Sequence, residues 1–188
     1  MVEVTLIRPT LAEVPAYVNA LKSGWSPDNV RGAEAANEQL DSISIDAAGF
    51  VASLHDPDAK AGPIKLPDGP LVARLPSIVR WIWDGDFCGS IGFRWQPGTS
   101  ALPEYVLGHI GFSVVPWKRG IGRAKQCLAL LLPEARNAGL SYVELTADPG
   151  NIASQKVIQA CRGRPIERFR KLAAYGSLEA IRFRIDLL

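Results

Sequence analysis

The sequence is poor in the residues from which disulfide frameworks and metal sites are built. Its 188 residues include three cysteines and two histidines, His55 and His109. The cysteines, Cys88, Cys127 and Cys161, are widely spaced and form no Cys-x-x-Cys pair, which argues against a disulfide framework and a zinc site. We therefore expect three small, buried apolar side chains and no bound metal.

An excess of charge of one sign is also missing. Lysine and arginine number 21, and aspartate and glutamate number 19, so the formal net charge is +2. Dedicated nucleic-acid binders carry a basic face or stripe, so no nucleic acid is expected among the partners. A local basic pocket is still compatible with this balance.

Long hydrophobic runs are absent as well. The longest apolar stretch, around Leu128–Leu132, is far too short to cross a bilayer, and the start MVEVTLIRPT does not read as a signal peptide. We expect a cytoplasmic protein without membrane contact. Hydrophobic residues make up 47% and charged residues 21%, which is typical of a globular chain. The length predicts a single domain over residues 1–188.

The N-terminal half predicts two helices and one strand. Val2–Ile7 alternates like a strand, and Thr10 is placed to cap a helix that ends near Lys22. A weaker helical pattern covers Gly32–Ile43. The proline-rich segment Asp56–Pro76 predicts a long irregular loop, a kind of segment that often binds ligands.

The C-terminal half begins with extended segments. Ile78–Trp83 and Phe87–Trp95 flank Asp84-Gly85, which is a strong hairpin signal. Tyr105–Val115 predicts a third strand. A helical stripe then runs from Ile121 to Ala135, with a kink or break expected at Pro133. The remaining pattern predicts a strand, a helix and two strands, at Tyr142–Ala147, Ile152–Cys161, Ile166–Leu172 and Ala180–Leu187. The order predicts a mixed α/β domain.

The segment Ser113–Ala124 carries the clearest chemical signal. A strand ends, a short loop with Gly120 and Gly122 follows, and a helix begins at once. Helix N-termini present unpaired N–H groups and partial positive charge, which suits a phosphate or pyrophosphate. Lys118, Arg119 and Arg123 add formal charge. The alternative is an ordinary turn with solvated basic residues. Neither GxxxxGK[ST] nor GxGxxG is present.

The stretch from Arg119 to Ala124, Arg-Gly-Ile-Gly-Arg-Ala, resembles the signature of the GNAT N-acetyltransferase superfamily, which wraps the pyrophosphate of acetyl-coenzyme A. The resemblance is most convincing from Gly108 to Gly163. It implies cofactor contacts through the backbone of the preceding strand end and through the Asn-x-x-Ser element downstream. The implied cofactor-binding residues are Val114, Val115, Arg119, Gly120, Ile121, Gly122, Arg123, Ala124, Asn151 and Ser154.

The resemblance also implies a fold and a reaction. The fold would be a single mixed α/β domain with a mostly antiparallel twisted sheet flanked by helices. The reaction would transfer an acetyl group from acetyl-coenzyme A, as cosubstrate, to a primary amine by direct attack on the thioester. Asn151 has a second interpretation, because asparagine before a helix is a common N-cap and Ser154 would be its partner.

The attacking amine must be neutral, so a base or a water chain has to take its proton. His109, within the strand, and Glu104, at its start, are the candidates. Many family members use a tyrosine as the acid for the leaving thiolate, and the matching position here is Ile158. The acid is therefore another group, water, or absent; Tyr175 is a candidate from its place near the C-terminal strands.

The acceptor is left open among a small amine, an amino acid, an antibiotic and a protein N-terminus. Tryptophans beside the carboxylates of Asp84 and Asp86 suit a cationic amine, but we favour core packing around a hairpin turn, so no acceptor residue is assigned. These tryptophans are Trp81, Trp83 and Trp95. Two other hypotheses are a noncatalytic acyl-coenzyme A module and a binder of another phosphorylated ligand. A homodimer is also considered.

Overall fold

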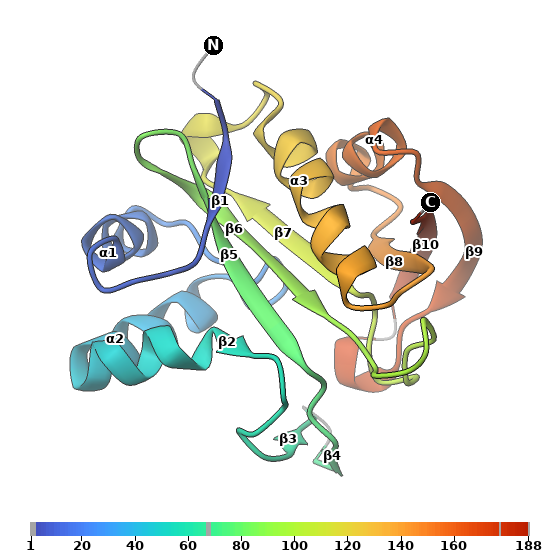
Figure 1. Ribbon diagram of the computed structural model, residues 1–188, viewed down its shortest axis with the longest axis horizontal. Helices are drawn as coiled ribbons and strands as arrows, with labels where there is room; N and C mark the ends of the chain where they lie inside the picture. Colours follow the sequence, from blue (N-terminus) through green and yellow to red (C-terminus); the bar gives the residue numbers. More distant parts are fainter. Residues whose placement is uncertain (1–2, 67–68, 177, 188) are drawn as a thin grey trace.

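The computed structural model describes residues 3–66, 69–176 and 178–187. Two antiparallel sheets stand beside each other, and helices lie against them (Figure 1). The chain builds the first sheet and its helices before it crosses to the second. The expected mixed α/β class, with mostly antiparallel pairing and flanking helices, is confirmed.

The first sheet is centred on the predicted hairpin. Its strands β5 (Ser77–Trp83) and β6 (Phe87–Arg94) pair on either side of the Asp84-Gly85 turn. The order is β1-β5-β6-β7, with β1 at Thr5–Ile7 and β7 at Ile110–Val114. A short strand, β2 (His55–Asp56), also pairs with β5. The strand β7 is thus an edge strand of this sheet.

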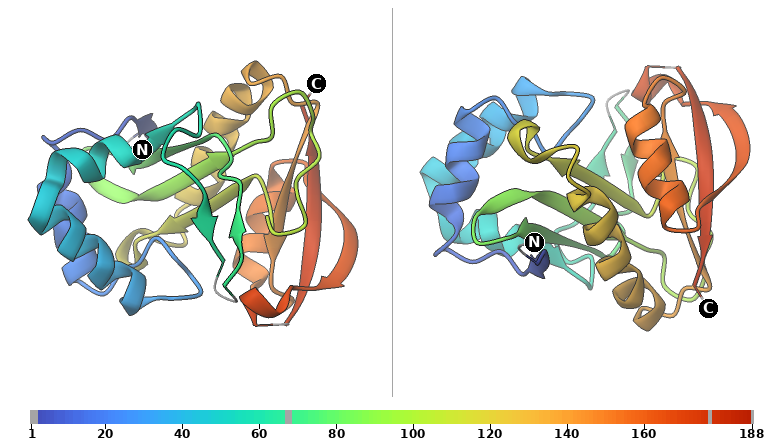
Figure 2. Two further views of the ribbon diagram at one scale, coloured as in Figure 1. Left: turned by 90° about the horizontal axis from the view of Figure 1, so that it is seen from below. Right: turned by 90° about the horizontal axis from the view of Figure 1, so that it is seen from above.

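The second sheet has the order β8-β10-β9. Its strands are β8 (Tyr142–Ala147), β9 (Arg164–Arg170) and β10 (Glu179–Asp186). The expected irregular loop after β2 carries a small two-stranded ribbon, β3 (Ile64–Lys65) and β4 (Leu71–Val72). In Figure 2 this ribbon lies between the helical half and the second sheet.

Four α-helices flank the sheets. The helices α1 (Val14–Lys22) and α2 (Ala33–Ser53) lie on one side of the first sheet, and α3 (Arg123–Asn137) lies on the other (Figures 1 and 2). The helix α4 (Ile152–Ala160) follows β8 and contacts both β8 and α3. Two 3-10 turns, η1 (Pro116–Lys118) and η2 (Ala173–Tyr175), complete the elements.

The two sides of the first sheet hold separate apolar cores. Under α1 and α2, Tyr17 stacks on Trp81 with a ring-centroid distance of 4.7 Å, and Trp25 and Phe87 meet Tyr17 edge-on. Under α3, Leu128 and Leu131 are fully buried in a cluster that reaches the second sheet. These layers fix β7 and the start of α3 relative to each other, which positions the candidate site.

All three cysteines are buried, as expected from their spacing. Cys88 and Cys127 are 0% exposed and Cys161 is 8% exposed. Each is a free thiol. Burial raises the pKa of Cys88 to about 11 and that of Cys127 to about 12, and it also raises the pKa of Cys161.

Several expected boundaries differ from the structure. The helix α2 continues ten residues past Ile43, because Asp46 leaves helical geometry and its Oδ1 accepts the Gly49 N–H at 2.8 Å, which starts a second helical segment. Pro133 does not split α3; it is exposed, so the missing N–H falls on the solvent side. The third strand begins only at Ile110. Val2, placed in the first strand, lies outside the described residues.

Candidate functional site

The two sheets meet at one point and separate beyond it. The His109 N–H donates to Glu144 O at 2.7 Å, and the Glu144 N–H donates to His109 Nδ1 at 2.9 Å. Gly108 allows this approach, because a Cβ there would lie 3.0 Å from Glu144 O. No ladder joins β7 to β8 over the described residues, so the strands diverge toward Val114.

A cavity of about 510 Å³ lies at this divergence. Its wall comes from the end of β7, the loop before α3, the first turn of α3, and the start of α4. The loop between α1 and α2 contributes Asn29, whose Nδ2 donates to Phe112 O at 3.4 Å. The lining residues are Asn29, Phe112, Ser113, Val114, Lys118, Arg119, Gly120, Gly122, Arg123, Ala124, Lys125, Asn151, Ala153, Ser154, Lys156 and Val157.

The start of α3 is suited to an anion. No side chain caps this helix, so its first amides are not taken by a cap. Gly120 and Gly122 have φ values of +77° and +84°, and a Cβ at either would point into open space. Five cations and no carboxylate line the described part of the cavity. A ligand with several phosphate charges fits this wall.

Two of these cations are held from behind by Asp84. Lys118 Nζ lies 2.7 Å from Asp84 Oδ1, and Arg123 Nη2 lies 2.6 Å from Asp84 Oδ2. Burial of the carboxyl group opposes ionisation, but the Lys118 hydrogen bond and both positive charges prevail and lower the pKa of Asp84 overall. The turn of the β5–β6 hairpin therefore anchors the loop at the start of α3.

A further contact ties the loop to the strand. Arg119 Nε donates to Val114 O at 2.9 Å, so the first residue of the expected signature fixes the end of β7 to the loop. Arg119 also lines the cavity. Ile121 has another position: its side chain is 56% exposed, and it is not part of the cavity wall.

The strand end presents different backbone groups from those expected. The Val115 N–H donates to Cys88 O at 2.9 Å, and the Val115 side chain is 0% exposed, so Val115 does not face the cavity. In an antiparallel pair, successive residues turn their N–H groups to alternate sides. The N–H groups of Val114 and Phe112 therefore point away from β6 toward the cavity. The sequence alternation could have indicated Phe112, which was not singled out.

Asn151 combines the two roles considered for it. Its Oδ1 accepts the Ser154 N–H at 3.1 Å, so it caps α4. Asn151 and Ser154 also line the cavity. Lys125 and Lys156 line it too but were not expected. Lys125 follows Gly122 by three residues, a spacing that puts two residues on one helix face, so it could have been predicted; Lys156 has no such spacing to Asn151 or Ser154.

The three candidate acid–base residues lie outside this cavity wall. His109 is 0% exposed, and burial lowers its pKa to about 4. Glu104 is exposed and borders a separate hollow beside β9 and β10. The Tyr175 hydroxyl donates to Tyr105 O at 2.8 Å. The position of the family tyrosine holds Ile158, which is 1% exposed in the core.

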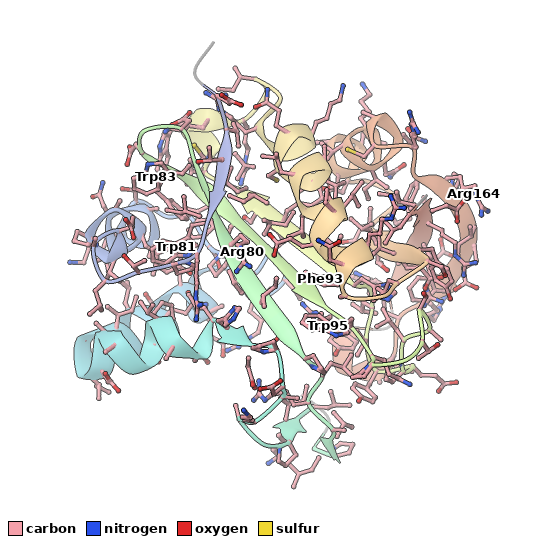
Figure 3. All side chains as sticks on the ribbon, viewed as in Figure 1. Arg80, Trp81, Trp83, Phe93, Trp95 and Arg164 are labelled. Atoms are coloured by element: carbon pink, nitrogen blue, oxygen red, sulfur yellow. The ribbon has the colours of Figure 1, made fainter. Side chains whose placement is uncertain are left out.

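The tryptophans serve packing rather than an aromatic cage. Trp81 is buried against Tyr17, Trp83 packs in the same cluster, and Trp95 stacks on Phe93 at 4.8 Å between ring centroids (Figure 3). Asp84 pairs with the cations described above. Asp86 Oδ1 accepts the Phe87 N–H at 2.7 Å within the turn. The packing interpretation of this group is therefore the one that the contacts support.

The split pair of sheets, with a basic glycine loop and an uncapped helix N-terminus at the opening, is suited to a phosphate-bearing ligand. Residues 47–163 match the acetyltransferase (GNAT) family, and the chain belongs to it. It is an acetyl-coenzyme A-dependent N-acetyltransferase, with acetyl-coenzyme A as cosubstrate and an amine as acceptor.

Solved structures share the fold at low sequence identity. One is the microcin C7 self-immunity acetyltransferase MccE in complex with acetyl-coenzyme A and AMP, with a TM-score of 0.63, 11% identity, and coverage of 98% of this chain and 92% of that one. Another, from Salmonella typhimurium, modifies the N-terminal serine of ribosomal protein L7/L12; its TM-score is 0.64, its identity 12%, and the coverage is 100% and 97%.

A third is RimJ from Mycobacterium smegmatis in complex with coenzyme A disulfide, with a TM-score of 0.60, 16% identity, and coverage of 97% and 81%. No curated protein matches the chain significantly in sequence. Over the described residues, no helix is long and apolar enough to span a membrane. The same residues contain no cluster of metal-ligating side chains.

Proposed function

We propose that acetyl-coenzyme A lies in the cavity between β7 and α4, with its pyrophosphate on the loop from Arg119 to Ala124. The bare N-terminus of α3 beside two open glycines carries this proposal. The pantetheine arm would follow the outward-facing N–H groups of Phe112 and Val114, and Asn151 and Ser154 would border it. The thioester would then lie toward Gly111, where β7 approaches the junction with β8.

The reaction needs three things from the chain: orientation, an oxyanion donor, and a route for one proton. The outward backbone N–H groups of β7 are placed to donate to the oxyanion that forms when the amine attacks the thioester carbon. The C–N bond forms and the C–S bond breaks, and the electron pair leaves on sulfur. A thiol of pKa about 8.5 leaves without an obligatory acid.

We infer that the amine loses its proton to water rather than to His109. His109 Nδ1 is occupied by the Glu144 N–H, and its pKa is about 4, so the imidazole is a weak base at neutral pH. The described lining of the cavity holds no carboxylate. Glu104 as the base and Tyr175 as the acid are the alternatives. The pH dependence of acetylation in a variant of each residue would distinguish them from water.

Calorimetric titration with acetyl-coenzyme A tests the cofactor site. We expect micromolar binding to the wild type and a loss of at least tenfold in Arg119→Ala and in Gly122→Asp. The first variant removes the contact to Val114 O, and the second puts a carboxylate and a strained side chain where the phosphate would lie. Arg164→Ala, on the far side of the second sheet, is the matched control (Figure 3).

The absence of binding to wild type at millimolar ligand would contradict the cofactor site, as would unchanged binding in both loop variants. We further propose that the 188 residues act as one domain and that the acceptor is a primary amine of a small molecule or a peptide. The structure that modifies the N-terminal serine of L7/L12 supports an amine acceptor of this kind. The homodimer stays a prediction.

A further inference from the structure

Two glycines face each other across β6 and β7. Gly92 pairs with Gly111, and the next pair on the same face is Ser90 with Ser113. Ser113 is covered, because Trp25 Nε1 donates to its Oγ at 2.9 Å. Gly111 is exposed, and a Cβ there would meet nothing within 4 Å. The sheet face is therefore bare at the Gly92–Gly111 pair.

A second hollow, of about 250 Å³, begins at Gly92, one member of this pair. Ser77, Val79, Gly92 and Arg94 line it and share one face of the first sheet by strand alternation. Its other walls come from the ribbon segment between β2 and β5, the loop before β7, and η2. We call this hollow, with Gly92 at its floor, the glycine hollow.

Two tyrosine hydroxyl groups join the loops around the glycine hollow. Tyr105 donates to Ala73 O at 2.9 Å, and Tyr175 donates to Tyr105 O at 2.8 Å. Three segments far apart in the sequence are thereby linked into one rim. These contacts give Tyr175 a place in the binding rim, although its hydroxyl group is engaged with a carbonyl group.

The glycine hollow and the cofactor cavity lie next to each other along the strands. Gly92 lines the hollow, its partner Gly111 is exposed on the edge strand β7, and the following residue, Phe112, lines the cavity. One strand residue spans about 3.3 Å. An acceptor in the hollow would therefore reach the thioester past Gly111, where no side chain obstructs it.

Positive charge dominates the glycine hollow. Arg74 and Arg94 line it, and no carboxylate is among its described lining residues. Arg74 Nε is occupied by Gly62 O at 2.8 Å. Arg94 is exposed, and over the described residues no ion pair joins its guanidinium group to a carboxylate, unlike those of Arg80 and Arg123. An exposed, unpaired guanidinium group in a hollow is suited to a carboxylate of a ligand.

We propose that the glycine hollow is the acceptor site and that it selects primary amines that carry a carboxylate a few bonds from the amino group. Arg94 binds the carboxylate, and the Gly92–Gly111 pair admits the amine to the thioester. This inference rests on the proposed function. It narrows the acceptor to amines that carry a carboxylate, either free amino acids or the acidic N-terminus of a peptide.

The experiment measures acceptor binding to the protein saturated with coenzyme A, by calorimetry. The probes are two matched pairs: 4-aminobutyrate against n-butylamine, and the C-terminally amidated peptide Ser-Glu-Glu-Ala against the amidated peptide Ser-Gln-Gln-Ala. We expect the carboxylate member of at least one pair to bind about tenfold more tightly or better. The pair that shows the difference identifies the source of the carboxylate. Steady-state acetylation of the same probes should show the difference in KM.

Arg94→Met should remove the preference for the carboxylate member and leave coenzyme A affinity unchanged. Arg94→Lys should retain part of the preference, because a point charge replaces a bidentate donor. Arg164→Met is the matched control. Equal binding of both members of each pair, absence of binding in every case, or a preference that survives Arg94→Met would overturn the proposal. Failure of the proposed function is a separate result, namely no acetyl-coenzyme A binding by wild type.

Discussion

Among single residues, Asp84 makes ion pairs that the sequence alone does not predict. The Asp-Gly dipeptide predicts a hairpin turn, and the structure has that turn. The carboxylate also reaches Lys118 and Arg123, which are 34 and 39 positions away in the chain. Because these pairs depend on how the β5–β6 turn lies against η1 and the start of α3, no local pattern could have revealed them. The basic loop and its glycines, in contrast, were predictable from the strand–glycine–helix order.

We expect Asp84→Asn to destabilise the protein by about 2 kcal/mol at pH 7, because it leaves two partly buried cations without their carboxylate. The pKa of Asp84 is lowered in the folded state, so its stabilisation is present above the unfolded value and is lost as pH falls through the folded value. The difference from wild type should shrink below about pH 4. Urea unfolding at pH 7 and pH 3 measures this.

Asp58→Asn is the control, since Asp58 pairs with Lys60 on the exposed surface and should change stability by less than about 0.5 kcal/mol. If Asp84→Asn matched this control at pH 7, Asp84 would not anchor the loop. A second measure is the affinity for acetyl-coenzyme A. Loss of the Asp84 charge beside Lys118 and Arg123 should make the affinity for acetyl-coenzyme A more sensitive to salt.

Among the elements, β6 and β7 approach each other closely at Gly89, next to the end of β7 that lines the cavity. Gly89 has φ +144°, and a Cβ there would lie 2.1 Å from Ser113 O and 2.8 Å from Val114 Cα. This is a backbone contact that only glycine permits. The sequence predicts both strands by alternation, but it does not show that they touch this closely, because the register between them is a property of the pair.

Gly89→Ala should therefore cost about 3 kcal/mol or more in the free energy of unfolding, since backbone rather than a flexible side chain must move. Gly111→Ala, on the partner strand, is the matched control: its Cβ would meet nothing within 4 Å, and its loss of stability should stay below about 1 kcal/mol. Chemical denaturation of the two variants compares them. Equal losses would mean that the close contact does not constrain β6.

The elements that the sequence misjudged share one cause. Helix α2 passes Asp46 because Gly49 bonds to that side chain, and α3 passes Pro133 because the proline faces solvent. Local propensity treats a polar residue or a proline in the same way wherever it points. The direction in which each points is set by packing, which a single sequence does not contain.

At the scale of the whole molecule, His109 joins the two sheets. Its Nδ1 accepts the Glu144 N–H, so the ring must stay neutral for this bond, and burial lowers its pKa to about 4. Its pKa is therefore lower in the folded protein than in the unfolded chain, so the unfolded chain binds the proton more readily. Stability is complete above the unfolded pKa of about 6.5 and decreases as pH falls toward the folded value. The sequence placed His109 on the strand but not at a junction.

We expect wild type to lose about 2 kcal/mol of unfolding free energy between pH 7 and pH 4.5 through His109. In His109→Gln this part of the pH dependence should disappear, although the variant is less stable at pH 7. Urea unfolding at both pH values gives the comparison, with His55→Gln as the control for the second histidine, whose pKa burial also lowers. A pH dependence that persists in His109→Gln would exclude this role.

The site lies where two sheets separate, so only part of it could be predicted from the sequence. The glycine loop and the Asn-x-x-Ser element are local, so the sequence shows them. The divergence of β7 from β8, the turn of Val115 back to Cys88, and the hollow at Gly92 and Gly111 each arise from pairs of distant segments. Phe112 and Arg94 acquire their roles only through that arrangement.

The buried cysteines have a chemical consequence for the reaction itself. Each turnover releases coenzyme A with a free thiol, while the chain keeps all three of its own thiols buried, with raised pKa values. A disulfide dye added to the native protein will therefore report the product and not the enzyme. For the same reason, oxidised coenzyme A meets no reactive thiolate on this chain, so turnover should resist the mixed disulfides that arrest enzymes with an exposed cysteine.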